Sequence, residues 1–83
     1  MVYEKIHLYK ALSDETRYRI IEFLLTGEKS VHEIMTHCKR AQPTISLQLN
    51  KLRHLGLITS RREGKRVLYR ISHDKLSTVH RLI

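Results

Sequence analysis

Between positions 42 and 48 the chain carries a run of amide and hydroxyl side chains whose chemistry is directional hydrogen bonding. The amides of Gln42 and Gln48 suit bidentate pairs with adenine. The hydroxyls of Thr44 and Ser46 suit contacts with bases or phosphates, and Leu47 suits the methyl group of thymine. This set of groups is typical of a surface that reads base edges.

Basic residues are concentrated in the half of the chain that holds these groups. Residues 1–37 contain five Lys or Arg and six Asp or Glu, which gives a net charge of −1. Residues 38–83 contain eleven Lys or Arg and two Asp or Glu, which gives a net charge of +9. The basic side chains that follow the run as far as position 66 are Lys51, Arg53, Arg61, Arg62, Lys65 and Arg66. Such clustering indicates a polyanionic partner, because each neutralised phosphate releases counterions. The alternative is a solvated basic surface without a partner.

A helix over residues 43–55 would position the polar run. Ile45, Leu49, Leu52 and Leu55 recur at helical spacing and predict its inner face, with Pro43 just inside its start and Gly56 at its end. The side chains predicted to face outward are Pro43, Ser46, Leu47, Asn50 and His54. That outer face has no acidic residue, which favours the approach of the helix to DNA. The alternative interpretation is an ordinary surface helix.

Three further helices are expected before it. Val2, Ile6 and Tyr9 form the apolar stripe of a first helix. Ser13 is the expected N-cap of a second, whose stripe runs from Ile20 to Leu25 and which Gly27 ends. A third begins at a capping box formed by residues 30–33, and its inner face holds Val31, Ile34, Met35 and Cys38.

Two strands and a last helix follow. The strands are expected over Leu57–Arg62 and Arg66–Ser72, and in the second strand Val67, Tyr69 and Ile71 alternate with Arg66, Leu68 and Arg70. The closing segment places Leu76, Val79 and Ile83 on one helical face. The order of elements predicts a mainly α fold with a small antiparallel hairpin, a winged helix-turn-helix, in one domain over residues 1–83.

Composition narrows the functional classes. No apolar run approaches the ~20 residues of a membrane span, and the single cysteine excludes an internal disulfide, so we expect a cytoplasmic, nucleoid-associated protein without a membrane partner. A chain of 83 residues buries little alone, so apolar stripes on both terminal helices favour a homodimer. Tyr69 is the only aromatic residue after position 37, which disfavours single-stranded nucleic acid.

Four segments, taken together, resemble the ArsR/SmtB family of winged helix-turn-helix repressors. Residues 8–21 (LYKALSDETRYRII) resemble the family's KALADPTRLRIL opening, and residues 42–49 (QPTISLQL) its SQSTVSRHL reading helix. Residues 52–58 (LRHLGLI) are similar to LREAGLV, and residues 61–69 (RREGKRVLY) to the family's wing. The resemblance covers residues 8–72, with the segments in the family's order.

This resemblance implies a homodimeric transcriptional repressor that binds double-stranded DNA, whose first and last helices form the dimer interface, and we expect a palindromic operator. The DNA contacts it implies are Gln42, Pro43, Ser46 and Leu47 in the reading helix and Arg62, Lys65 and Arg66 in the wing. Two positions depart from the pattern: Ala41 replaces a capping Ser, and Leu47 replaces an Arg or His.

The family's metal sensors need ligands that this chain largely lacks. Where relatives carry Cys-Val-Cys, residues 30–32 are Ser-Val-His, so neither thiolate is available. A second family site uses acid and His residues on the last helix, where His73, Asp74 and His80 are weak candidates across a dimer interface. We therefore expect no cofactor and no soft-metal site.

Cys38 leaves two interpretations open. Its place on the inner face of its helix favours a buried structural thiol. Alternatively, Lys39 and Arg40 lower its pKa and make it a redox sensor. A protein-interaction module is a further alternative, although it leaves the +9 half unexplained. An enzyme is not expected, because the sequence shows no nucleophile–base pair, paired carboxylates or Gly-rich phosphate loop.

Overall fold

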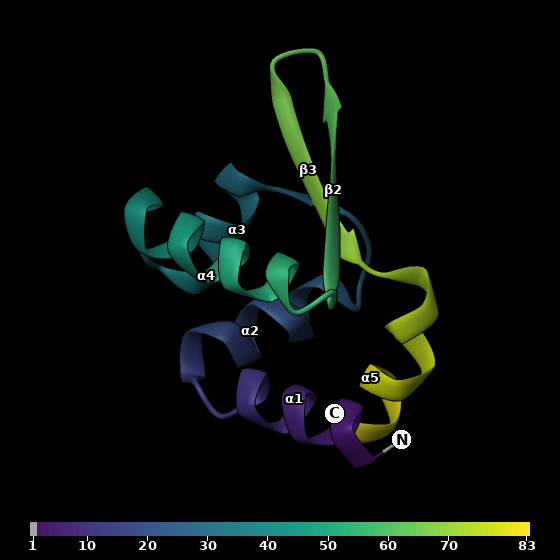
Figure 1. Ribbon diagram of the computed structural model, residues 1–83. Helices are drawn as coiled ribbons and strands as arrows, with labels where there is room; N and C mark the ends of the chain where they lie inside the picture. Colours follow the sequence, from purple (N-terminus) through teal and green to yellow (C-terminus); the bar gives the residue numbers. More distant parts are fainter. Residues whose placement is uncertain (1) are drawn as a thin grey trace.

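A computed structural model describes residues 2–83, and the side chains of residue 6 and of residues 8–83. The chain folds as a winged helix-turn-helix in which a long hairpin rises away from a cluster of helices (Figure 1). The elements are α1 (Val2–Leu12), α2 (Glu15–Leu24), β1 (Lys29–Ser30), α3 (Val31–Cys38), α4 (Gln42–His54), β2 (Ile58–Glu63), β3 (Arg66–Ile71), a 3₁₀ turn η1 (His73–Lys75) and α5 (Leu76–Leu82). None of the helices described is long and apolar enough to span a membrane.

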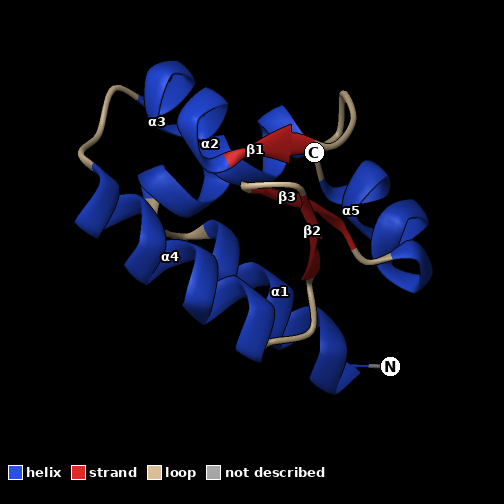
Figure 2. Ribbon diagram, turned by 90° about the horizontal axis from the view of Figure 1, so that it is seen from above, coloured by secondary structure: helices blue, strands red, loops and turns tan. Residues whose placement is uncertain are grey.

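The sheet has three antiparallel strands in the order β1-β3-β2, with α5 on the side away from α4 (Figure 2). The expected hairpin is confirmed, and its register runs from Ile58 opposite Ile71 to Glu63 opposite Arg66. Gly64 and Lys65 alone form its turn, where Gly64 has a φ of +62° that favours glycine. Strand β1 was not predicted, because two residues are too few for an alternation.

The core lies where the inner faces of the helices meet the base of the sheet. Ile45, Leu49 and Leu52 of α4 are fully buried, as expected from their spacing. Burial of each such side chain contributes about 1.5–3 kcal/mol. The other buried members of this core are Leu8, Ala11, Ile20, Ile21, Leu24, Ile34, Cys38, Leu57, Ile58, Ile71 and Val79.

Two expected orientations are wrong. Leu55 is 37% exposed, because α4 ends at His54 and Leu55 lies beyond its last turn. Leu68 is buried, whereas the alternation placed it on the exposed face with Arg66 and Arg70. The reason is that β3 is the central strand, so that Leu68 lies between Ser30 of β1 and Arg61 of β2.

The helix starts follow local hydrogen bonding. Ser30 and Glu33 form the expected capping box: the Ser30 Oγ accepts from the Glu33 N–H, and the Glu33 carboxylate accepts from the Ser30 N–H. The expected cap at Ser13 is wrong. Asp14 is the N-cap of α2 and accepts from the Arg17 N–H, while the Ser13 hydroxyl donates to the Lys10 carbonyl at the end of α1.

Candidate nucleic-acid interface

A tight turn sets the angle between α3 and α4. Helix α3 ends at Cys38 and α4 begins at Gln42, so that three residues join them. Lys39 closes α3 in the left-handed conformation with a φ of 55°. Pro43 lies in the first turn of α4, as expected, and the Ala41 N-cap offers no side-chain oxygen to the helix. The first turn of α4 is thereby left open to solvent.

The outward face of α4 is exposed and free of acids. Gln42, Pro43, Thr44, Leu47 and Asn50 are exposed, and Leu47 has 54% of its surface accessible although it is apolar. No Asp or Glu occurs in the sequence between positions 33 and 63. The positive end of the helix dipole therefore meets no side-chain carboxylate of its own segment, which favours an anionic partner.

The second half of α4 differs from its first turns because its polar groups bond to one another. The Arg53 guanidinium donates to Asn50 Oδ1 at 3.1 Å and to the Ser60 hydroxyl of β2 at 3.5 Å. The His54 Nδ1 lies 2.8 Å from the Asn50 carbonyl oxygen. Ser46 is half-buried, whereas Lys51 is exposed. Arg53 thus links the reading helix to the base of the hairpin.

Gln48 does not lie with the exposed residues of α4. Its side chain is half-buried, and its Oε1 accepts a hydrogen bond from Arg17 Nη1 of α2 at 3.1 Å. Sequence reasoning missed Arg17, because its partner is 31 residues away and no local pattern marks such a pair.

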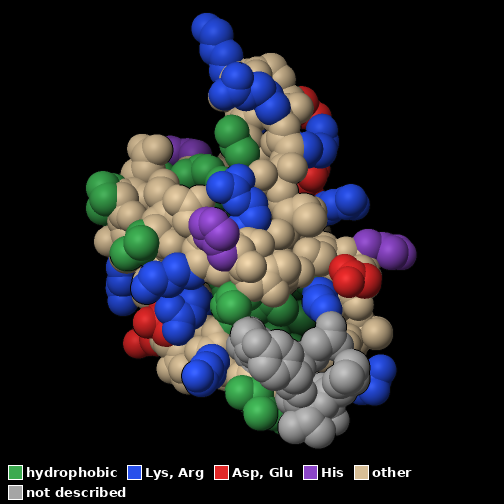
Figure 3. Space-filling model, in the orientation of Figure 1, with side chains coloured by type: hydrophobic (Ala, Val, Ile, Leu, Met, Phe, Trp, Pro, Cys, Tyr) green, Lys and Arg blue, Asp and Glu red, His purple; other side chains and the backbone are tan. Residues whose placement is uncertain are grey.

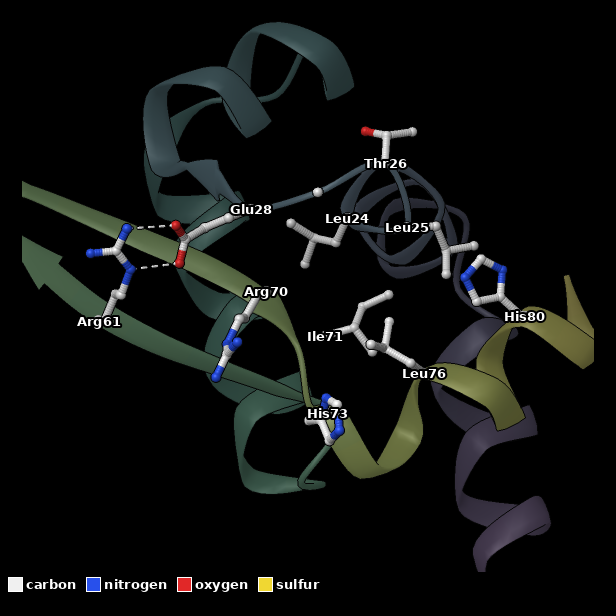
Figure 4. A pocket seen from close by; sticks show the side chains of 11 residues that line it. Leu24, Leu25, Thr26, Glu28, Arg61, Arg70, Ile71, His73, Leu76 and His80 are labelled. Atoms are coloured by element: carbon white, nitrogen blue, oxygen red, sulfur yellow. Dashed lines mark hydrogen bonds and ion pairs between the residues drawn. The ribbon is translucent and has the colours of Figure 1, made fainter.

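In the hairpin, Arg61 is held by acids. Its Nε and Nη2 donate to the two carboxylate oxygens of Glu28, each at 2.8 Å (Figure 4). Its Nη2 also lies 3.2 Å from the Glu63 carboxylate. The hydrogen bonds from Arg61 lower the pKa of the Glu28 carboxyl, and these carboxylates raise the pKa of Arg61. Arg61 therefore anchors β2 to the segment before β1.

Arg66 is held less tightly than Arg61, and Arg62 and Lys65 near the tip of the hairpin have no such contact with the described residues. Arg66 Nη2 lies 3.7 Å from the Glu33 carboxylate, whose pKa is lowered first by the hydrogen bond from the Ser30 backbone. Arg62 and Lys65 are exposed, and neither forms an ion pair or side-chain hydrogen bond with the part of the chain described. Lys and Arg side chains gather at the tip of the hairpin (Figure 3).

The candidate metal ligands do not converge. His73 and His80 line one cleft from opposite ends of the η1–α5 segment, with Leu76 between them (Figure 4). Asp74 is exposed and lies 3.8 Å from the Lys75 ammonium. Within the described residues no three His, Cys, Asp or Glu side chains form a group that could hold a metal ion. The Ser30 hydroxyl, at a family thiolate position, is engaged in the capping box and does not suit a soft metal.

Cys38 is buried in the core with 1% of its surface exposed. Burial raises the pKa of its thiol, although Arg19 and Arg40 act in the opposite direction. Of the two interpretations left open for Cys38, its burial favours the structural thiol, because loss of solvation outweighs the charge of the neighbouring cations. A raised pKa disfavours the thiolate that oxidation requires.

An exposed helix after a tight turn, flanked by a basic hairpin, defines the winged helix-turn-helix class of DNA-binding domains. Residues 14–60 match the model of the family described as "Bacterial regulatory protein, arsR family". The chain belongs to this family of transcriptional regulators, whose members are not enzymes.

Proteins similar to this chain in sequence are named as repressors or transcriptional regulators. The arsenical resistance operon repressor of Escherichia coli is 44% identical over 81% of this chain and 58% of its own length. An uncharacterised HTH-type transcriptional regulator of Methanocaldococcus jannaschii is 36% identical over 98% of this chain and 93% of its own length. The chain spans only 55% of another relative, a probable mercury resistance operon repressor of Streptomyces lividans that is 32% identical over 83% of this chain.

Solved structures confirm the fold. HlyU from Vibrio cholerae has a TM-score of 0.88 at 30% identity and covers 98% of this chain and 89% of its own. The repressor BigR from Xylella fastidiosa has a TM-score of 0.86 at 35% identity, and the match covers 98% of this chain and 84% of BigR. A homodimeric winged helix-turn-helix DNA-binding domain from Mycobacterium bovis has a TM-score of 0.83 at 32% identity, and the match covers 98% of this chain and 75% of that domain.

Proposed function

We propose that this chain is a homodimeric repressor that binds double-stranded DNA sequence-specifically, with α4 in the major groove and the β2–β3 hairpin against the adjacent backbone. The observation that carries this proposal is the exposed, acid-free start of α4, whose Gln42 lines one cleft together with Lys65 of the hairpin turn. Arg62 and Lys65 of the hairpin have no partner among the described residues. A neutral face with amide and hydroxyl groups suits base edges, and exposed cations suit phosphates.

The proposed division of labour follows from exposure and pairing. Gln42 reads adenine, Leu47 contacts a thymine methyl, and Pro43 lets the helix start approach the base edges. Phosphate contacts come from Arg62 and Lys65, which set position and affinity. The residues proposed as secondary contacts are Thr44, Ser46, Asn50, Lys51, Arg53 and Arg66.

Dimer formation is proposed through α1 and α5, which lie at the end of the molecule away from the hairpin (Figure 1). Ile6 and Tyr9 of α1 are 48% and 56% exposed, and Ile83 is 37% exposed. Val2, expected on the same stripe, lies outside the described side chains. Exposed apolar groups on a small domain favour a partner surface, and a two-fold dimer would match a palindromic operator.

We further propose that this regulator does not sense soft metals through thiolates. Several relatives carry names that refer to arsenic or mercury resistance, but here Ser30 and His32 occupy the thiolate positions and Cys38 is buried. With its raised pKa, Cys38 is also a poor redox sensor. We therefore propose a cytoplasmic protein that binds DNA constitutively, so that the amount of DNA bound depends on the concentration of the protein itself.

Selection of bound duplexes from a random pool tests the function directly. We expect recovery of a palindrome whose two half-sites are separated by about one helical turn, and affinity that falls steeply as salt rises. Recovery of no common sequence, together with binding that does not respond to salt, would favour a protein-interaction module instead. Titration of the DNA complex with zinc, cadmium and arsenite should release no DNA, and stoichiometric release would contradict the non-metal proposal.

A further inference from the structure

The Arg17 side chain connects the end of α1 to the middle of α4. Its Nε donates to the Ala11 carbonyl at 3.0 Å, its Nη2 to the Lys10 carbonyl at 3.3 Å, and its Nη1 to Gln48 Oε1 at 3.1 Å. The two carbonyls belong to the last turn of α1, where helix carbonyls lack partners within the helix. The half-buried Arg17 guanidinium therefore shares the closing of α1 with the Ser13 hydroxyl, which also donates to the Lys10 carbonyl, and it holds α4 at the same time.

From this geometry we propose that Arg17 is a positioning residue that fixes the reading helix relative to the dimer helix, and that Gln48 is its partner rather than a base-reading residue. A bidentate pair with adenine needs both the oxygen and the nitrogen of an amide. The Gln48 oxygen is already bound to Arg17, and a guanidinium offers only donors. Gln42, which is exposed and has no hydrogen-bond partner among the described residues, keeps both atoms available to DNA.

The hydrogen bonds of Arg17 are important for the position of α4 because they lie next to a cleft between α1 and α4. A cleft of about 370 Å³ is lined by Lys10 and Ala11 of α1 and by Lys51, His54 and Leu55 at the end of α4, with Arg17 in its wall. Ala11 of α1 is buried in the same core as Leu49 and Leu52 of α4, but across this cleft it is the Arg17 side chain that joins the two helices. A planar guanidinium with three hydrogen bonds holds them there with little freedom.

This inference rests on the proposed function, because spacing becomes important only in a dimer on DNA. If α1 forms the dimer interface, the separation of the two reading helices depends on how each α4 is held against its own α1. That separation must match the distance between half-sites. Arg17 would therefore select the half-site spacing, while the outer face of α4 selects the bases.

The test compares four variants on the selected palindrome, on palindromes whose half-sites are moved by one base pair, and on a duplex of random sequence. Arg17→Ala removes the whole link, and Gln48→Ala removes only its α4 end. Gln48→Glu keeps an acceptor for Arg17 but loses the amide that could pair with adenine. Arg19→Ala is the matched control, because Arg19 lies on the same helix and its one ion pair with a described residue is to the exposed Glu15. Thermal unfolding is measured for every variant.

We expect Arg17→Ala and Gln48→Ala to bind the correctly spaced palindrome about tenfold more weakly, the loss that corresponds to one charge-assisted hydrogen bond. Both should lose most of their discrimination against shifted half-sites. Gln48→Glu should keep wild-type spacing discrimination and base preference, and Arg19→Ala should keep the spacing discrimination. Gln48→Ala provides the test even if Arg17→Ala does not fold, because the α1 cap remains intact in it.

Two results would overturn the inference. A change of preferred base in Gln48→Ala and Gln48→Glu, with spacing discrimination unchanged, would show that Gln48 reads DNA. Spacing discrimination in folded Arg17→Ala equal to that of Arg19→Ala would show that Arg17 has no positioning role. Failure of the wild-type protein to select any palindrome would instead contradict the proposed function, and it is seen before any variant is made.

Discussion

Replacing Arg62 by alanine should weaken binding to every DNA sequence similarly and reduce its salt dependence. Arg62 is exposed on β2 and unpaired within the described part of the chain, so that its charge is available to a phosphate. Each phosphate contact contributes about 0.9 to the slope of log affinity against log salt. A dimer carries two such residues, and the expected loss of slope is about 1.8.

The size of the effect follows from that slope. Between about 50 and 200 mM salt, a contact with a slope of 0.9 accounts for roughly 3.5-fold in affinity, and two contacts account for roughly twelvefold. Arg61→Ala should change the slope by less than half as much, because the Arg61 guanidinium is bound to Glu28 and Glu63 instead of being free for phosphate.

Fluorescence anisotropy with one specific and one random duplex, at graded salt, measures both quantities. Arg19→Ala is the charge-matched control, since Arg19 is exposed on α2, outside the hairpin, α4 and the helices proposed for the dimer interface. Its slope should equal that of the wild type. If Arg62→Ala and Arg61→Ala reduced the salt-dependence slope equally, the reasoning that ion pairs within the protein decide which cations contact phosphate would be refuted. An altered sequence preference in Arg62→Ala would show that the wing reads bases.

Leu47→Ala should lower the ratio of specific to random affinity by about 1–3 kcal/mol, measured by competition binding, whereas an unchanged ratio would place Leu47 outside the groove. Tyr9→Glu should give a monomer in sedimentation, because it puts a charge on the exposed stripe of α1; a persistent dimer would locate the interface elsewhere. Ser30→Ala should cost about 1 kcal/mol in chemical unfolding through loss of the α3 cap, and no loss would contradict that role. Since burial raises the pKa of Cys38, its folded thiol should resist alkylation, and stability should fall as pH rises above the usual pKa of a thiol, because the unfolded chain then loses the proton first.

Helical periodicity and local capping could be read from the sequence because both depend on residues a few positions apart. The spacing of Ile45, Leu49 and Leu52 places them on one face whatever surrounds the helix, and these side chains are buried. The capping box is equally local, since Ser30 and Glu33 bond to one another across one turn. Ser13 failed as a cap because Asp14, one residue later, offers the same chemistry.

Features that depend on distant pairing could not be derived in this way. Strand β1 exists only because Lys29 and Ser30 lie opposite Tyr69 and Leu68, and that pairing also buries Leu68. The bond from Arg17 to Gln48 likewise joins residues that no periodicity relates. As a result, the sequence identified which polar groups lie on α4 but not which of them are already bound within the protein.

The same limit applies to the charge pattern from which a DNA partner was first inferred. The acidic residues Glu28 and Glu33 belong to the half of the chain with a net charge of −1, yet they lie against Arg61 and Arg66 of the basic half. Net charge therefore overstates the number of cations that can meet phosphate. An arginine that bonds a carboxylate through two nitrogens must lose that contact before it binds DNA, whereas Arg62 has no such contact with any residue that the structure describes. Ion pairs to the body thus orient the hairpin, and the cations left unpaired are the ones expected to determine how steeply binding depends on salt.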